Sequence, residues 1–413
     1  MTEPAPSQLI GTAGRKYLTA AILGFLSAVA PLSIDMYLPA LPTLGRDLHA
    51  ATSVAQLSLT ACLVGLAVGQ LLGGPISDAR GRRTPLLIGT AVYTAASMLC
   101  AVTNSIYLLI ILRLVQGLAG SVGLVISRAI VRDLFEGHEM TEFFALLMLV
   151  NGVAPIAAPI LGGQILRFGS WHDVFIVLTA LGCLMFISVW FGLPESLPKS
   201  KRQLGGIRHT STTVGMLLRD KHFIGYSFTI GLVFAAMFAY ISGSPFVLQG
   251  MFGLSPQMFS VAFATNGLGI IIAGQISARL SRRYGETKVL VGGLMLACAA
   301  SLVFLVMLAL KAPLTGVLPP LFFIVCTVGI VGPTATSLAM QEQGNRAGSA
   351  AAVIGVPQML MGAITAPLVG IMGSHADMPL GVVVLLCDVA AALCYVVLVR
   401  LSAHTPSASA AGN

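Results

Sequence analysis

Twelve runs of apolar residues, each long enough to cross a lipid bilayer, follow one another along the chain and leave little room for anything else. Only 9 % of the 413 residues are charged, and 56 % are hydrophobic even without the 45 glycines. A soluble protein of this size could not cover its surface with so few charges, and a disordered chain needs the opposite composition. The sequence therefore predicts an all-α membrane protein with 12 transmembrane helices. The runs cover residues 17–41, 52–77, 86–104, 106–130, 143–166, 172–193, 222–249, 257–280, 287–310, 315–340, 347–373 and 379–401.

The longest hydrophilic connection divides the twelve runs into two sets of six. It holds two prolines and most of the basic residues of the central region. We therefore predict an N-terminal six-helix bundle over residues 1–193, a linker over 194–221 and a C-terminal six-helix bundle over 222–413.

The positions of Lys and Arg predict the orientation in the membrane. If the N-terminus is cytoplasmic, 19 of the 23 basic residues lie on the cytoplasmic side, three lie outside and one, Arg113, lies within a span. We expect both termini and the linker to be cytoplasmic. The net charge of +8 is then an orientation signal, and we expect no nucleic-acid partner.

The two halves carry a repeated segment after their second runs. Residues 74–83 (GPISDARGRR) and residues 274–283 (GQISARLSRR) share Gly, Ile, Ser and two Arg at equal positions. Six spans separate the copies, so both lie on the same side of the membrane. This arrangement is typical of parallel repeats in two-bundle transporters. Ala278 replaces Asp78 in this comparison, and Gly285 falls four residues later than Gly81 would place it.

Four motifs in order make the chain resemble the major facilitator superfamily. Residues 74–83 resemble its loop signature between helices two and three, and residues 112–117 (LRLVQG) resemble its fourth-helix signature. Residues 154–163 (APIAAPILGG) resemble its fifth-helix antiporter signature. Residues 35–42 (DMYLPALP) are similar to the Bcr/CflA branch of drug:proton antiporters, which is associated with bicyclomycin and chloramphenicol resistance.

This resemblance implies a major facilitator fold with two pseudo-symmetric bundles. It also implies a secondary transporter, not an enzyme, that works by alternating access without a cofactor and is driven by the proton gradient. The implied activity is efflux of small amphiphilic compounds, including antibiotics, across a bacterial inner membrane, by a monomer embedded in the lipid bilayer.

Ionisable residues inside spans are expensive and are functional candidates. The inventory is short: Asp35, Arg113 and Asp388. Asp35 and Arg113 lie at similar estimated depths, so they could face each other. Asp can bind and release a proton, whereas Arg keeps its own. We expect Asp35 and Arg113 to form a proton and substrate site, with a structural ion pair as the alternative. For Asp388, in the last span, we expect a local polar contact.

Further polar groups in spans complete the candidate site. Gln116 lies on the same helical face as Arg113, where it can form a hydrogen bond or simply contribute to helix packing. Tyr37, Tyr240 and Gln358 are further candidates to line an apolar substrate cavity.

The loop after the second span is expected to act as a conformational latch, a set of contacts that forms in only one state of the transport cycle. Asp78 can accept hydrogen bonds from neighbouring helices, and the arginines can pair with acidic groups such as Asp133. The alternative is simple anchoring by positive charge. The residues assigned to the latch are Gly74, Asp78, Gly81, Arg82, Arg83, Arg132 and Asp133.

The fifth span is expected to bend and slide. Pro155 and Pro159 remove backbone hydrogen bonds, and Gly162 and Gly163 allow another helix to approach closely. This suits a moving interface.

The sequence lacks the motifs that several other classes of protein need. The chain has no phosphate-binding loop for ATP and no nucleophile motif, its seven cysteines lie in apolar runs, and no metal site is expected. Two alternatives to drug export remain open: a sugar or amino-acid exporter of the same superfamily, and a membrane sensor without transport.

Overall fold

The computed structural model describes residues 13–135, 137–202, 220–341, 347–370 and 377–401. Within these residues every regular element is a helix, and eleven are long and apolar enough to cross a membrane. A further helix, α14 (Ala347–Leu368), stands at the predicted eleventh span. The prediction of a twelve-helix membrane protein is confirmed, with ends that differ from the predicted ones by a few residues.

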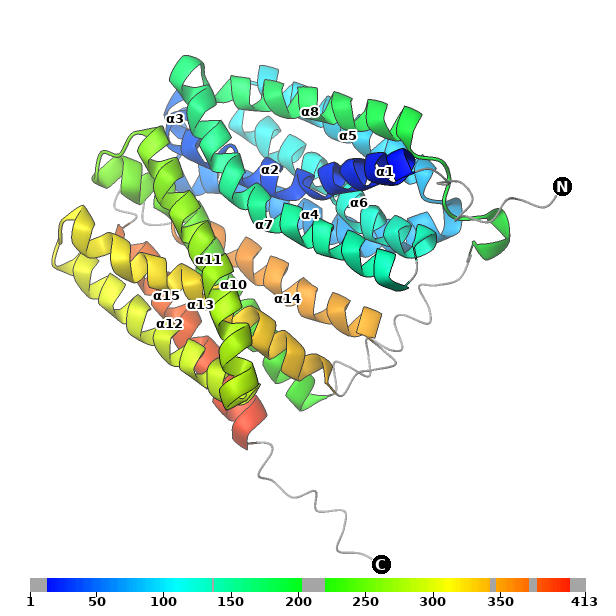
Figure 1. The fold of residues 1–413 in the computed structure, drawn as a ribbon. Coiled ribbons are helices and arrows are strands. Elements are labelled where there is room, and N and C mark those ends of the chain that lie inside the picture. The colour runs from blue at the N-terminus through cyan, green and yellow to red at the C-terminus, as the bar shows by residue number, and fades with distance from the viewer. Residues whose placement is uncertain (1–12, 136, 203–219, 342–346, 371–376, 402–413) are drawn as a thin grey trace, which may run out of the picture. The chain divides into compact units, whose positions relative to one another are not determined.

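The chain clusters into two compact units, each with its own core. Unit 1 comprises residues 1–207 and 244–265, and unit 2 comprises residues 208–243 and 266–413. The helices of the first half are α1 (Ala13–Ser27), α2 (Val29–Asp35), η2 (Leu38–Ala40), α3 (Leu41–Asp47), α4 (Thr52–Arg80), α5 (Arg83–Val102), α6 (Ile106–Leu134), α7 (Gly137–Phe168), α8 (Trp171–Gly192) and η3 (Lys199–Lys201) (Figure 1). Those of the second half, besides α14, are α10 (Lys221–Pro245), the π-helix η4 (Phe246–Met251), α11 (Pro256–Tyr284), α12 (Glu286–Ala309), α13 (Leu314–Met340), α15 (Asp377–Cys394) and the π-helix η6 (Tyr395–Leu401).

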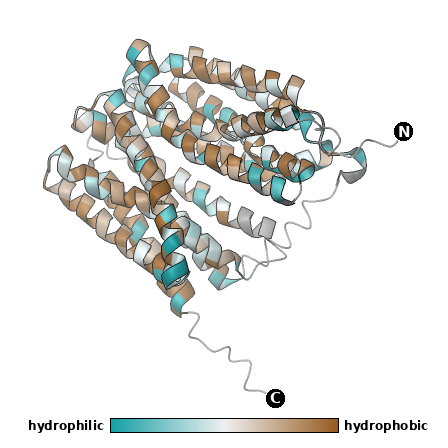
Figure 2. Cartoon of the chain, in the orientation of Figure 1, coloured by the Kyte–Doolittle hydropathy of each residue, from teal (hydrophilic) through white to brown (hydrophobic). Residues whose placement is uncertain are grey.

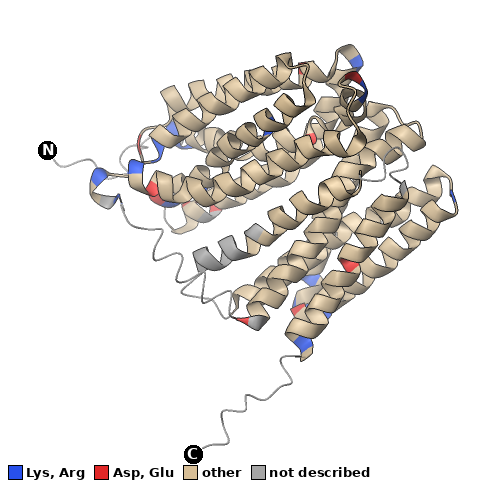
Figure 3. Ribbon diagram, turned by 180° about the vertical axis from the view of Figure 1, so that it is seen from behind, with Lys and Arg blue, Asp and Glu red and all other residues tan. Residues whose placement is uncertain are grey.

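Hydrophobic side chains cover the outside of the helices as well as the cores. Leu23, Leu86 and Val189 are buried in the core of unit 1, and Leu290 and Val331 in that of unit 2. Many other apolar side chains are exposed, and Figure 2 shows hydrophobic colour along most helices. Charged residues gather near helix ends, while the helix middles carry very few (Figure 3). This is the distribution that a lipid environment requires.

The first span is not one straight helix. It breaks at Ala28 and again after Asp35, where a 3₁₀ turn with Pro39 near its start leads into α3. Proline lacks the N–H that would continue the α-helical ladder, so the chain changes direction there. The break places Asp35 at the end of α2 and Tyr37 just beyond it.

Close packing of α4 against α6 fixes the position of the fourth-span motif. A Cβ on Gly65 would collide with the Leu114 carbonyl, and one on Gly117 with the Cys62 carbonyl. Only glycine lets these backbones approach so closely. Arg113 and Gln116 are therefore held in the interior of unit 1.

The structure corrects the comparison of the two repeated loops by one helical turn. Helices α4 and α11 both end at a glycine with positive φ, Gly81 at +93° and Gly285 at +89°. Each glycine N–H donates to a serine carbonyl four residues earlier, on Ser77 and Ser281. Gly285 is thus equivalent to Gly81 in the repeat, and the residue equivalent to Asp78 is Arg282, not Ala278. The sequence comparison aligns identical residues, whereas the structure aligns the C-terminal ends of the two helices.

Candidate functional site

The centre of unit 1 holds a buried polar cluster around Arg113, a fully buried residue of α6. Its Nη1 donates to Gln116 Oε1 at 2.6 Å, and Gln116 Nε2 donates to Ser97 Oγ on α5 at 2.7 Å. Gln116 and Ser97 are fully buried as well. The predicted polar role of Gln116 thus takes the form of a bridge between the guanidinium and α5.

Two aromatic rings cover the guanidinium. Its Cζ lies 4.5 Å from the centroid of the Tyr37 ring and 5.7 Å from that of Phe175 on α8. The Tyr37 hydroxyl forms a hydrogen bond of 2.7 Å with Ser58 Oγ on α4. A desolvated cation–π contact can stabilise a buried charge by about 2 kcal/mol. We call Arg113, Gln116, Ser97, Tyr37 and Ser58 the Arg113 cluster.

The guanidinium is only partly satisfied. Its Nε and Nη2 are buried and make no hydrogen bond to any residue that the structure describes. Arg stays protonated in proteins, and an unmet buried donor costs about 1–3 kcal/mol, more for a charged group. The cluster therefore has two donors ready for an acceptor that this conformation does not supply.

Asp35 does not pair with Arg113 in this structure, so the alternative interpretation, a structural ion pair, is not seen, and the predicted role of the two residues as a proton and substrate site stays a prediction. The carboxylate is 6 % exposed and forms no hydrogen bond or ion pair with another described residue. The depth estimate treated the first span as a straight helix. Because the helix breaks after Asp35, the ring of Tyr37 and not the carboxylate comes to lie over the guanidinium.

Tyr240 and Gln358, the other predicted cavity residues, belong to unit 2. Tyr240 on α10 is buried, and its hydroxyl accepts a hydrogen bond of 2.8 Å from Asn266 Nδ2 on α11. Gln358 is half-buried on α14. Their predicted role in substrate binding stays a prediction.

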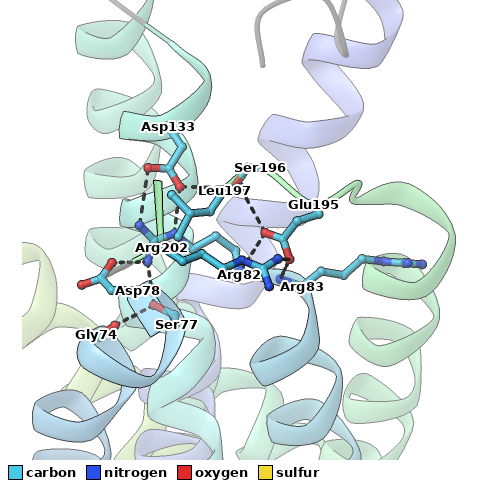
Figure 4. A network of polar contacts seen from close by, with 10 residues as sticks. All are labelled: Gly74, Ser77, Asp78, Arg82, Arg83, Asp133, Glu195, Ser196, Leu197 and Arg202. Carbon is cyan, nitrogen blue, oxygen red and sulfur yellow. Dashed lines mark hydrogen bonds and ion pairs between the residues drawn. The ribbon is translucent and has the colours of Figure 1, made fainter. Parts of the chain in front are cut away.

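A second polar network joins α4, α5 and α6 at one end of unit 1 (Figure 4). The Arg82 side chain, 3 % exposed, lies at its centre. It donates to Asp133 Oδ2 at 2.8 Å, to Asp78 Oδ1 at 2.6 Å and to Ser77 Oγ at 2.7 Å. Burial alone would lower the pKa of Arg82, but the hydrogen bonds and charges of Asp133 and Asp78 outweigh burial and raise that pKa. Arg82 is thus a permanently charged bridge between two helix ends.

Glu195 is a member of this network that the sequence reasoning missed. Its carboxylate accepts hydrogen bonds from the backbone N–H groups of Arg82 at 2.8 Å and Arg83 at 3.3 Å. It also accepts from the Leu197 N–H and lies 3.7 Å from the Arg202 guanidinium. A carboxylate on these free N–H groups caps the start of α5 and complements its dipole. Glu195 is the only acidic residue between Asp173 and Asp220, a signal that could have singled it out.

The other predicted latch residues take different places. Arg83 does not reach an acidic side chain through its guanidinium, which donates to the Trp190 carbonyl at 2.6 Å and lies over the Trp190 ring. Arg132 is exposed and stands outside the network. The Gly74 carbonyl accepts from Ser77 Oγ, but a Cβ on Gly74 would meet open space, so nothing in the structure requires glycine there.

The corresponding junction of unit 2 has the opposite polarity. Glu286 opens α12 where Arg82 precedes α5, and it accepts hydrogen bonds from Ser337 Oγ at 2.8 Å and Gln341 Nε2 at 2.9 Å. A carboxylate held by neutral donors thus replaces the arginine held by two carboxylates. The two copies of the repeat share the glycine at the helix end but differ in the charge of the residue that follows it.

We expect Glu195→Gln to destabilise unit 1, because an amide oxygen is a weaker cap than a carboxylate. The expected loss is about 1–2 kcal/mol in the free energy of unfolding. Thermal unfolding of the purified protein in detergent measures it. Glu142→Gln is the matched control, since Glu142 is exposed and its one ion pair among the described residues is with the exposed His138. Equal shifts in the two variants would show that Glu195 contributes nothing as a cap.

The proline-containing helix α7 packs against the break in the first span. A Cβ on Gly162 would collide with the Met36 carbonyl, and one on Gly163 with Ser260 Oγ. Ser260 Oγ also lies 2.6 Å from the Pro159 carbonyl, its hydrogen-bond partner. The two glycines therefore make the close approach that the sequence predicts, whereas sliding of α7 stays a prediction.

Comparison with known proteins shows one family over most of the chain. The family model described as Major Facilitator Superfamily matches residues 23–406. The uncharacterized MFS-type transporter YdgK of Bacillus subtilis is 43 % identical over 93 % of this chain and 96 % of its own. A bicyclomycin resistance protein homolog of Haemophilus influenzae is 30 % identical over 90 % of this chain and 94 % of its own. The crystal structure of a D-xylose-proton symporter matches with a TM-score of 0.73 and 16 % identity over 93 % of this chain and 98 % of that one, a likeness in fold alone.

Proposed function

Since the chain belongs to the Major Facilitator Superfamily and is a membrane transporter, not an enzyme, we propose that it exports small amphiphilic compounds, antibiotics included, in exchange for protons. The name of the Haemophilus influenzae relative supports an antibiotic as one substrate. Proton exchange is supported by the chain's own residues.

One observation carries the proposal: the membrane-embedded carboxyl group of Asp35 and the buried guanidinium of Arg113 both belong to the chain's first bundle, and neither is paired with an opposite charge among the described residues. Asp35 lies two residues before Tyr37, whose ring covers Arg113. Arg113 keeps two donors without an acceptor. A protonated Asp35 does not require a countercharge, whereas an ionised one does. Loss of the proton thus favours movement of Asp35 toward the free donors of Arg113.

The exchange cycle follows from these two states. Substrate enters from the cytoplasm and drives the proton off Asp35, and the ionised carboxylate then turns to Arg113. Substrate leaves outside, and a proton from outside restores the neutral carboxyl. Each proton moved inward supplies about 2.3 kcal/mol per 100 mV of membrane potential. No cofactor is needed, because the proton gradient supplies the free energy.

The network around Arg82 serves in this proposal as the conformational latch. It concentrates one buried arginine, Asp78, Asp133 and Glu195 at helix ends. Asp78 remains 47 % exposed, so it can change partners while Asp133 holds Arg82. The orientation that the basic residues predict places this network, both termini and the 194–221 linker in the cytoplasm, and the protein in a bacterial inner membrane.

A substrate panel in proteoliposomes with an imposed pH gradient tests the proposed function. We expect antibiotics and other amphiphilic compounds to move against their gradients when the proton gradient is present, and not after an ionophore collapses it. Movement of sugars or amino acids alone would identify a metabolite exporter. No movement of any compound would favour a sensor and refute transport.

A further inference from the structure

A second carboxyl group, far along the chain from Asp35, is buried without a partner in unit 2. Asp388 lies near the middle of the span Met378–Leu401, and it is 1 % exposed. Both of its carboxyl oxygens are inaccessible and make no hydrogen bond to any described residue. An ionised carboxylate in this position would be shielded from solvent and would have no countercharge among the described residues. In the arrangement that the structure shows, Asp388 therefore carries a proton.

The surroundings of Asp388 contain donors that are engaged elsewhere. Helix α15 packs along α12, beside which it lies in Figure 1. From α12, Ser301 borders the carboxyl group, but its hydroxyl donates to the Ala297 carbonyl at 2.7 Å. The Cys298 thiol donates to the main-chain carbonyl of Asp388 at 3.5 Å. Both donors can turn toward the carboxyl by rotation about a single bond.

Among the residues that the structure describes, no charged side chain interacts with this carboxyl group. The titratable neighbours are Cys298 from α12 and Cys387 from α15 itself. Helix α14, which also contacts α15, has no ionisable residue in its sequence. The nearest groups in η6, Tyr395 and Arg400, lie at least about 10 Å further along the helix axis. The state of Asp388 thus depends on its proton and on two neutral donors.

We propose that Asp388 is a second proton-binding site of the transport cycle, located in unit 2 and independent of the Arg113 cluster. When the contact of α12 with α15 loosens, the carboxyl O–H bond breaks and the proton passes to water. The Ser301 hydroxyl and the Cys298 thiol then turn from the backbone carbonyls to the carboxylate. Restoring the packing requires a proton again, so the protonation of Asp388 is linked to the packing of this helix pair. This inference rests on the proposed proton exchange.

Infrared titration of the purified full-length protein tests the site without any transported compound. We expect a carboxylic C=O band that disappears as pH rises and that is absent from Asp388→Asn, while the band of Asp35 remains. Ser301→Ala removes a donor that stabilises the ionised form, so the midpoint of the Asp388 band should move to higher pH. A buried carboxyl that only fills space would show no change of its band with pH, and this result would overturn the proposal, as would an unchanged midpoint in Ser301→Ala.

A second measurement connects the site to the cycle. On addition of a substrate identified by the proteoliposome panel, in weak buffer, Asp388→Asn should release fewer protons than the wild type, and its substrate affinity should depend less on pH. Unchanged release would show that Asp388 takes no part in the cycle. If the panel finds no export while the infrared band still titrates, the proposed function fails and the proton site itself stands. If export is proton-driven but the band does not titrate, only the site fails.

Discussion

Asp35→Asn is expected to abolish uphill export while the protein still inserts into the membrane. The amide resembles the protonated carboxyl in shape and cannot release a proton, so the exchange step is lost. One proton at 100 mV supplies about 2.3 kcal/mol, which sustains a concentration ratio of roughly 50. In the variant this ratio should fall to about one, because transport without coupling only equalises concentrations. Substrate accumulation in proteoliposomes, with and without a proton gradient, measures the change.

Proton release on substrate addition gives the sharper test of the same variant. The wild type should acidify a weak buffer when substrate binds, and Asp35→Asn should lose the share that Asp35 contributes. Asp47→Asn is the matched control, since Asp47 lies in the same first span, and an amide can still accept the hydrogen bond from Trp171 Nε1. Undiminished release from Asp35→Asn would locate the proton elsewhere and remove this residue from the site.

The fold could be predicted from the sequence because hydrophobicity and length determine which segments span a membrane. The positions of all twelve helices follow from the apolar runs. A run of apolar residues does not predict the direction of the chain after a helix break. The prolines near Asp35 signalled a break in the first span, but packing against α6 and α8 decides which side chain then lies over Arg113.

The Arg82 network shows a different limit. The pairing of Arg82 with Asp133 could be predicted because the two residues carry opposite charges and both lie near span ends that the basic residues place on the cytoplasmic side. Glu195 falls within the linker predicted over residues 194–221, and nothing in its immediate sequence points to a contact with α5. Its role depends on a tertiary contact between the segment after α8 and the start of α5, and hydrophobic periodicity in the sequence does not predict such a contact. The two copies of the repeat align one helical turn away from the sequence match, because the glycines with positive φ that end the two helices are recognised only from the backbone.

Two substitutions of Arg113 are expected to separate its contribution to stability from its contribution to transport. Arg113→Ala removes a large, fully buried side chain, so it should destabilise the protein by about 2–5 kcal/mol as well as stop coupled export. Arg113→Met keeps much of the volume and removes a buried charge that has two unmet donors. Replacing such a charge with an apolar side chain of similar size is often neutral or stabilising. Arg113→Met should therefore unfold at the wild-type temperature or above, and yet accumulate no substrate.

Thermal unfolding and proteoliposome flux, measured on the same preparations, decide between these roles. Arg113→Lys completes the series. Its ammonium keeps the charge but lacks the planar guanidinium, which can donate to Gln116 and to a second acceptor at the same time. Export should therefore fall although the charge remains. Loss of stability in Arg113→Met as large as that in Arg113→Ala would mean that the guanidinium mainly holds helices together. Normal export by Arg113→Met would mean that Asp35 exchanges its proton without a cationic partner, and the step in which the ionised carboxylate turns to Arg113 would have to be discarded.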